Sequence, residues 1–341
     1  MTKTKKAIMA ALATTALTAT TASAQEITLR TADSLPVGHY MFETVLKPMQ
    51  EATTEATGGA VAFEHFPAQQ LGKAKDMLSL AQSGVADIAY VGASYVADKL
   101  PLSSVGELPE AFSTSCEGTM AFWELAQPGG MIDQAEYAPE GVRALAVLVL
   151  TPYQVFASGE MAGLGDIDGM KVRVTGAPKI AAIEKLGGVP VSVSGPETRE
   201  ALSRGTVDAI AFPHGSIAPY DLAPHIKTAT DGVNFGSFVA TWMIAQSKFD
   251  SLPEEVQTAL TEAGAAATKS GCEAADAQLA EDKKQIAADG VTFITYSDED
   301  KAKLAETMAT VGDEWGADLD GRGKPGTDVL NAFREALKKG M

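Results

Sequence analysis

The stretch GMKVRVTGAPKIAAIEKLGGVPVSVSGPETREALSRGTVDAIAFP, residues 169–213, decides the fold of this chain. It holds three short β-branched segments separated by two helical ones, and Gly187 and Gly205 end the helices as glycine does past a last apolar turn. Strands that alternate with helices form a βαβαβ unit, hence a mostly parallel sheet with ligands at the strand ends. We expect strands at 171–175, 189–193 and 207–212, and helices at 178–186 and 197–203.

The rest of the chain repeats this pattern. Residues 81–91 (AQSGVADIAYV) and 202–212 (LSRGTVDAIAF) share a helix, a glycine, an aspartate and an apolar strand, which favours two lobes of similar build. Residues 254–289 are alanine-rich and predict one long helix or two in series. We also expect strands at 26–32, 60–66, 85–91, 142–150, 238–245 and 291–296, and helices at 41–56, 298–314 and 327–339.

The N-terminus has the pattern of a signal peptide. A basic segment with Lys3, Lys5 and Lys6 precedes a mildly apolar stretch, and Ala22-Ser23-Ala24 is an A-x-A cleavage signal. The apolar stretch is too short and too rich in threonine to span a bilayer. Residues 1–24 are therefore expected to be removed, leaving a free periplasmic protein that begins near Gln25.

The charge of the chain is strongly negative. Of 341 residues, 27 are Lys or Arg and 44 are Asp or Glu, giving a formal net charge of −17, and loss of the three signal-peptide lysines brings it to −20. Such a surface argues against nucleic-acid binding, which needs basic patches. It does not exclude an acidic ligand, because the charge within a site can oppose the overall sign.

The only two cysteines are Cys116 and Cys272. A periplasmic location permits a disulfide between them. The sequence does not decide the matter, and we expect two separate buried thiols on two helices.

The motifs of residues 169–213 resemble those of the solute-binding proteins of tripartite ATP-independent periplasmic (TRAP) transporters. That family reads GxKxRV, then LGAxPV, then ExYxALxxGxVDGxExP, and this chain reads GMKVRV, LGGVPV and ETREALSRGTVDAIAFP in the same order. Further matches follow the chain from end to end, at the glycine turn 57–59, at Gln70-Leu71-Gly72 and at 252–257, which reads LPEEVQ.

The resemblance implies a two-lobed α/β fold of the periplasmic-binding-protein type, type II-like, with a long helix across both lobes and a ligand cleft between them. It implies hinged closure over a small organic ligand and delivery of that ligand to a membrane permease pair, with no membrane-embedded part in this chain. We expect lobe I at 25–150 and 238–271 and lobe II at 151–237 and 272–341.

The residue patterns give no support to catalysis, a metal site or a cofactor. None of the four histidines lies in an HExxH motif or at ligand spacing from a cysteine. The segment 163–165 (GLG) precedes a strand and so is not a dinucleotide loop, and the aspartates at 166 and 168 lack the final glutamate of a calcium loop. A periplasmic enzyme on the same scaffold stays the alternative from another class.

Arg173 is the sharpest candidate for ligand binding. The resemblance implies that this arginine makes a bidentate salt bridge to a substrate carboxylate, which suits the planar guanidinium. The chain departs from the family at Tyr153, where many members have a second basic residue, at Phe212 in place of an asparagine, and at Glu110 in place of an aromatic residue. These departures favour a small monocarboxylate with an apolar or aromatic part.

A second interpretation stays open. If Glu110 faces the cleft it could receive an ammonium group, and the aromatic faces of Tyr153, Phe212 and Trp242 could bind a small amine or zwitterion. By position, His39, Tyr40 and Ser94 are expected to line the cleft opposite Arg173. The sequence names neither the ligand nor the oligomeric state, and a sensory receptor would look the same as a transport receptor.

Overall fold

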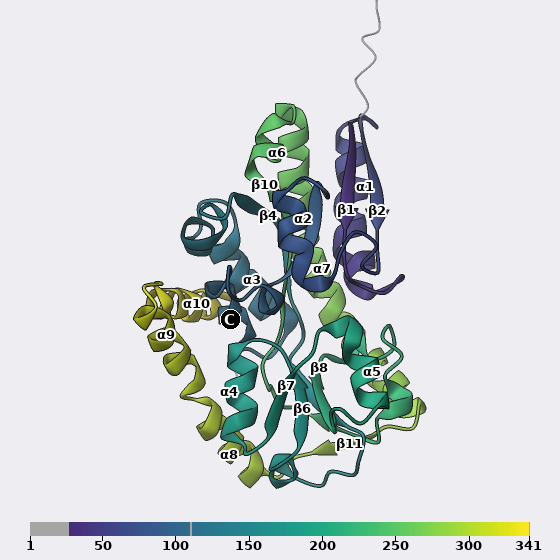
Figure 1. Ribbon diagram of the computed structural model, residues 1–341, viewed down its shortest axis with the longest axis vertical. Helices are drawn as coiled ribbons and strands as arrows, with labels where there is room; N and C mark the ends of the chain where they lie inside the picture. The colour runs from purple at the N-terminus through teal and green to yellow at the C-terminus, as the bar shows by residue number, and fades with distance from the viewer. Residues whose placement is uncertain (1–26, 110, 341) are drawn as a thin grey trace, which may run out of the picture.

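The computed structural model describes residues 27–109 and 111–340, which form two lobes joined by several crossings (Figure 1). The predicted signal peptide and Glu110 lie outside the described residues. Within them, no helix combines the length and apolar character needed to cross a membrane. The two-lobed α/β fold expected from the resemblance is confirmed.

The first lobe is built on a five-stranded sheet with the order β2-β1-β3-β10-β4. β1 runs parallel to β2 and β3, whereas β10 is antiparallel to both of its neighbours. The apolar segment of β4 is almost entirely buried, as its sequence predicted. The strands are β1 (Ile27–Ala32), β2 (Val61–Phe66), β3 (Ile88–Gly92), β4 (Val142–Val149) and β10 (Val239–Ala245).

The second lobe is built on a six-stranded sheet with the order β11-β9-β5-β8-β6-β7. β6 is parallel to β7 on one side and to β8 on the other, which is the βαβαβ unit predicted from residues 169–213. β5 is antiparallel to β8 and β9. The strands are β5 (Gln154–Ala157), β6 (Lys171–Val174), β7 (Val189–Ser192), β8 (Ala209–Phe212), β9 (Thr228–Asp231) and β11 (Thr292–Thr295).

Helices cover both sheets and end the chain (Figure 1). The α-helices are α1 (Lys47–Ala56), α2 (Met77–Gln82), α3 (Ser115–Ala126), α4 (Ala177–Lys185), α5 (Thr198–Ser203), α6 (Gln246–Ser251), α7 (Glu254–Ala288), α8 (Asp298–Met308), α9 (Val311–Gly321) and α10 (Gly326–Gly340). The short helical turns that matter for the site are η3 (Ala93–Tyr95), η4 (Leu102–Glu107), η7 (Gly195–Glu197) and η8 (His214–Ser216).

The two chain segments that cross between the sheets pair with each other. One leads from β4 to β5 and the other from β9 to β10. The Tyr153 amide donates to the Gly236 carbonyl at 2.8 Å, and the Leu150 amide donates to the Phe238 carbonyl at 3.0 Å. Because the crossings are bonded to each other, they form one two-stranded connection between the lobes.

α7 is a single helix of 35 residues, which at 1.5 Å per residue is about 52 Å long. It packs against β4, α1 and α3 of the first lobe, and its Lys283 forms an ion pair with Asp231 of the second lobe at 2.6 Å. Gly264 lets it approach the sheet closely, because a Cβ atom there would lie 2.1 Å from the Leu145 carbonyl oxygen.

The expectation of two separate thiols is wrong, because Cys116 and Cys272 form a disulfide that joins α3 to α7. These helices pack side by side, which brings the two Cα atoms to 4.8 Å although 156 residues separate them in the chain. The Asp276 carboxylate strengthens the same junction by accepting from the amides of Ser115 and Cys116 at the start of α3.

Two differences from the predicted elements concern short segments. β5 and β9 were not predicted, because QVFA and TATD lack the flanking helix patterns and glycine stops that marked β6, β7 and β8, and TATD in β9 has little apolar character. The helix predicted at 298–314 is two helices, and the break falls next to Thr310, a β-branched residue with weak helix propensity.

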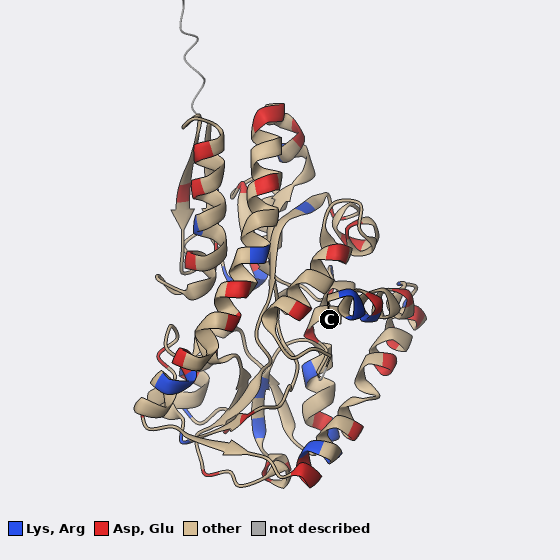
Figure 2. Cartoon of the chain, turned by 180° about the vertical axis from the view of Figure 1, so that it is seen from behind, with Lys and Arg blue, Asp and Glu red and all other residues tan. Residues whose placement is uncertain are grey.

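Acidic residues occur on helices of both lobes, consistent with the net charge of −17 (Figure 2).

Candidate functional site

A small cavity lies between the lobes where the crossing segments meet the ends of β6 and β8. It encloses about 20 Å³, so its walls are nearly in contact with one another. Both lobes contribute to it, and most of its lining is aromatic. The lining residues are Met41, Tyr90, Tyr95, Leu150, Tyr153, Arg173, Gly195, Phe212, Ser216, Tyr220 and Phe238.

Arg173 is the one charged side chain among these lining residues and is only 1% exposed. It extends from β6, a strand inside the second sheet. Its Nε atom donates to the Val193 carbonyl at 2.8 Å and its Nη1 atom to the Ala211 carbonyl at 3.4 Å, just past β7 and within β8. The guanidinium carbon lies 4.8 Å from the centroid of the Phe212 ring.

Arg173 has no carboxylate partner within 4 Å among residues 27–109 and 111–340. Carbonyl groups and an aromatic face hold the side chain but leave its charge uncompensated. A buried charge is costly unless it is paired. An anion between the lobes would supply this missing partner.

Tyr153 and Phe212 lie beside Arg173, as expected, and form an aromatic wall with Tyr220. The Tyr153 and Phe212 ring centroids are 6.1 Å apart, and Phe212 meets Tyr220 edge to face at 5.8 Å. Burial raises the pKa of Tyr153 and that of Tyr220 well above the usual value. Both side chains are therefore neutral phenols at any physiological pH.

His39 is completely buried next to this wall but does not line the cavity. Its Nδ1 atom accepts from the Met41 amide at 3.2 Å, so the ring proton lies on Nε2, which faces the Ser216 hydroxyl at 3.4 Å. Desolvation by burial lowers the pKa of His39 to about 3, which keeps the ring neutral.

Tyr40 stacks on His39 with 4.8 Å between ring centroids and is half-buried. It lines a second, larger cavity of about 410 Å³ between the lobes, next to α7. Burial raises the pKa of the Tyr40 hydroxyl, and a hydrogen bond with Ser216 partly opposes that rise. Tyr40 therefore belongs to this second cavity and not to the lining of the cavity around Arg173.

Two further candidates lie away from the cavity lining. Ser94 donates its hydroxyl proton to Glu107, and Trp242 is fully buried in β10 with its ring 5.8 Å from that of Tyr90. Trp242 therefore supports a lining residue from behind. Glu110 lies outside the described residues, so nothing is added to its expected role.

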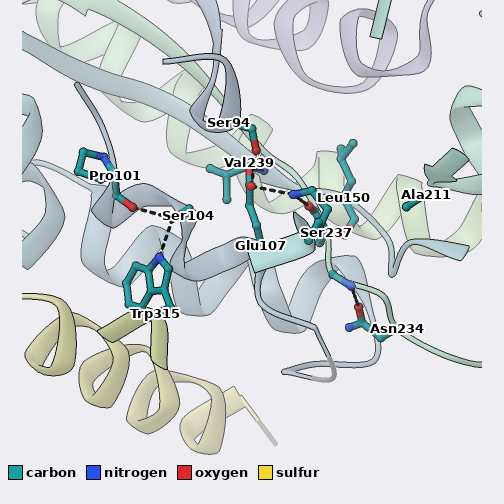
Figure 3. A network of polar contacts seen from close by, with 12 residues as sticks. Ser94, Pro101, Ser104, Glu107, Leu150, Ala211, Asn234, Ser237, Val239 and Trp315 are labelled. Carbon is teal, nitrogen blue, oxygen red and sulfur yellow. Dashed lines mark hydrogen bonds and ion pairs between the residues drawn. The ribbon is translucent and has the colours of Figure 1, made fainter. Parts of the chain in front are cut away.

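The sequence analysis missed a buried ion pair next to the site. Lys179 Nζ lies 2.7 Å from Glu107 Oε2, and neither side chain is exposed. Glu107 also accepts from Ser94 and, at 3.2 Å, from the Val239 amide, while Lys179 donates to the Ser237 carbonyl. Figure 3 shows Glu107 with Ser94, Val239 and Ser237 around it. The lysine charge is thus matched within the protein, unlike that of Arg173.

A signal for this pair was present in α4. Its buried positions are Pro178, Lys179, Ala182 and Ile183, so a lysine occupies the apolar stripe of the helix. A charged residue on such a stripe needs a buried partner. The other missed residues, Tyr95 and Tyr220, carry no local signal because only the fold brings them to Arg173.

The described residues contain no group of three or more His, Cys, Asp or Glu side chains placed to hold a metal ion. What the arrangement offers is recognition: one unpaired guanidinium, several neutral phenols and apolar rings in a closed space.

Comparison with known proteins gives consistent matches. The family model of bacterial extracellular solute-binding proteins, family 7, matches residues 31–318. A solute-binding protein of Roseobacter denitrificans is 27% identical over 300 residues, which is 85% of this chain and 88% of that protein.

Solved structures show the same fold. A TRAP periplasmic solute-binding protein from Bordetella bronchiseptica with bound (R)- and (S)-mandelate has a TM-score of 0.82 and 23% identity, covering 92% of this chain and 99% of that one. A TRAP solute-binding protein from Rhodoferax ferrireducens in complex with copurified benzoate has a TM-score of 0.83 and 21% identity, covering 92% and 98%.

Proposed function

The chain belongs to the bacterial extracellular solute-binding proteins of family 7, and on this premise we propose that it captures a small monocarboxylate with an apolar or aromatic part in the periplasm. It then delivers this ligand to the membrane permease of a TRAP transporter. The proteins of this family are solute receptors and not enzymes, so the proposed chemistry is recognition.

The observation that carries the proposal is the uncompensated charge of Arg173. Arg173 as a whole is 1% exposed, and carbonyl oxygens accept from its Nε and Nη1 atoms. A ligand carboxylate would complete its hydrogen bonds and neutralise its charge in a space with little water. The Bordetella and Rhodoferax proteins with bound mandelate and benzoate support the ligand class.

The aromatic wall supports a ligand with a flat or apolar body. Phe212, Tyr153 and Tyr220 offer ring faces and edges at ordinary aromatic contact distances. The neighbouring Lys179 is paired with Glu107, so a dianion would find no second free cation there. The site therefore matches a ligand that carries a single carboxylate.

A small amine or zwitterion fits the described residues less well. The Phe212 face that would attract an ammonium group already has the Arg173 guanidinium 4.8 Å from its centroid. A second cation there would be repelled, unless Glu110 enters the cleft. No second ligand class is therefore proposed.

The cavity of about 20 Å³ holds no aromatic acid, so the ligand enters when the lobes move apart about the paired crossing segments. Contacts from both lobes to the ligand then favour closure, because a ligand shifts the equilibrium toward the state that it binds better.

The test is a thermal-shift screen of the mature protein against small carboxylates, followed by calorimetric titration of the tightest. Arg173→Ala should weaken binding by at least about 30-fold, since it removes a charge-assisted pair. Arg199→Ala is the matched control, because Arg199 pairs with Asp221 on the surface. Unchanged carboxylate affinity in a folded Arg173→Ala variant would contradict the assignment.

A further inference from the structure

We propose that Tyr95 is the second anchor of the ligand carboxylate, so that the anion is clamped between Arg173 of one lobe and the Tyr95 hydroxyl of the other. This inference rests on the proposed function and specifies how the same site reads its ligand. It concerns a residue that the sequence analysis did not single out.

The hydrogen bonding of the Tyr95 hydroxyl leaves its own proton unused. The Gly195 amide donates to Tyr95 Oη at 2.9 Å. An amide N–H can only donate, so the tyrosine oxygen accepts in this bond. Burial raises the pKa of Tyr95, so the hydroxyl keeps its own proton. None of its described partners can accept that proton.

A ligand carboxylate supplies the acceptor. Tyr95 and Arg173 line the same cavity of about 20 Å³, so an oxygen that binds Arg173 lies close to the Tyr95 hydroxyl. The phenol proton can then point to this oxygen, and the Gly195 amide that donates to Oη strengthens the bond by polarising the O–H group. Arg173 and Tyr95 would thus hold one anion from two sides.

Two tyrosine hydroxyls lie close to the backbone at Gly195. A Cβ atom at this position would lie 3.0 Å from Tyr220 Oη and 3.1 Å from Tyr95 Oη. Two phenol oxygens therefore converge on the backbone of η7, where only a glycine leaves them unhindered. The converging hydroxyls face the same cavity as Arg173, since all four residues line it.

Tyr95 belongs to the lobe opposite Arg173. It ends η3 directly after β3 of the first lobe, and its ring packs 5.1 Å from Phe238 in the crossing segment. Gly195 and Arg173 belong to the second lobe. A carboxylate held by Tyr95 and Arg173 thus joins the lobes, and a ligand without a strong acceptor would join them less well.

The test compares Tyr95→Phe with its control Tyr296→Phe. Both changes remove one tyrosine hydroxyl, but Tyr296 lies outside the cavity lining and its buried hydroxyl bonds to no described group. The mature protein is first titrated with benzoate, (R)-mandelate and pyroglutamate, and the tightest acid is used throughout. We expect Tyr95→Phe to raise Kd about 10- to 100-fold, the effect of losing a hydrogen bond to a charged group. Tyr296→Phe should change Kd by less than about threefold.

Two further variants separate a ligand contact from a structural role. Gly195→Ala should raise Kd by about 10-fold or more without loss of the fold, because its methyl group crowds both hydroxyls. When Tyr95→Phe is added to Arg173→Lys, the fold-change in Kd should differ from the fold-change that Tyr95→Phe causes in the parent protein. The reason is that residues that hold one carboxylate are coupled. Melting temperatures confirm that each variant is folded.

The outcomes distinguish the two proposals. If Arg173→Ala weakens binding but folded Tyr95→Phe binds within about threefold of the parent, the clamp is wrong and the proposed function stands. Equal losses in Tyr95→Phe and Tyr296→Phe also overturn the clamp. If the parent binds no small carboxylate, both proposals fall.

Discussion

Lys179 and Glu107 meet across the two lobes as a fully buried ion pair, with 2.7 Å between Nζ and Oε2. Lys179 lies on α4, next to the strand that carries Arg173, and Glu107 ends η4 in the first lobe. One of the two neighbouring cations is therefore matched inside the protein, and the other is left for the ligand.

Glu107→Gln should lower the free energy of unfolding by about 3–5 kcal/mol, because it leaves the buried Lys179 charge without a partner. Burial already lowers the pKa of Lys179, and Glu107 opposes that shift. Urea unfolding at pH 7 measures the change. The double variant Glu107→Gln/Lys179→Met should recover most of the loss, since it removes both charges. A double variant as unstable as the single one would show that Glu107 acts through Ser94 and Val239 instead.

Replacing both Cys116 and Cys272 by serine should lower the free energy of unfolding by about 2–5 kcal/mol. The disulfide links α3 to α7 across 156 residues, so its loss enlarges the unfolded ensemble. Denaturant unfolding of the variant, compared with the parent before and after reduction, checks this. The reduced parent should resemble the variant, and equal stabilities of oxidised parent and variant would contradict the prediction.

The fold should lose stability in acid partly through His39. Its folded pKa is lowered to about 3 from an ordinary 6.5, so below pH 6.5 the unfolded chain binds a proton that the native state does not. This contribution is complete above pH 6.5 and is lost as the pH falls toward 3, at up to about 1.4 kcal/mol per pH unit.

Urea unfolding between pH 4.5 and 8 measures this slope. Glu136 acts in the opposite direction, because burial raises its pKa to about 7 and favours the native state at low pH. The comparison is therefore between the parent and His39→Gln. The variant should be less stable at pH 7, but its free energy of unfolding should fall less steeply as the pH is lowered. His225→Gln, in a more exposed position, is the control. An unchanged slope in His39→Gln would contradict the prediction.

Gly264→Ala should destabilise the protein although alanine favours helices. The new methyl group would lie 2.1 Å from the Leu145 carbonyl oxygen, so α7 must move away from β4. We expect a loss of about 1–3 kcal/mol in the free energy of unfolding, as for other overpacked contacts. Ser270→Ala, on an exposed position of the same helix, should change stability by less than about 0.5 kcal/mol. A gain in stability for Gly264→Ala would show that the helix adjusts without cost.

Much of the fold could be predicted because its signals are local. Residues 169–213 carry the strand and helix patterns and the glycine stops of β6, α4, β7, α5 and β8 within one stretch. β5 and β9 lacked such signals, and their pairing depends on strands that lie far from them in the chain, β8 for β5 and β11 for β9. The disulfide could not be predicted, because the packing of α3 on α7 is a property of the assembled lobe.

The residues of the candidate site also differ in whether the sequence carries a local signal for them. Arg173, Tyr153 and Phe212 were predicted from a motif and from departures from it, and the fold places them around one cavity. Tyr95 and Tyr220 were missed because an isolated tyrosine in a loop looks like any other. Lys179 gave the one readable signal, a cation on an apolar helix stripe, but its partner Glu107 is 72 residues away.

The late position of β10 in the chain affects the order in which the two lobes can finish folding during synthesis. This strand pairs with both β3 and β4, yet it follows the whole second sheet except β11 in the chain. A chain that emerges from its N-terminus therefore holds β1 to β4 as an unfinished sheet until residues 239–245 appear, and Cys116 has no partner until residue 272. The first lobe to begin emerging is therefore unable to finish folding until most of the second sheet has also been made.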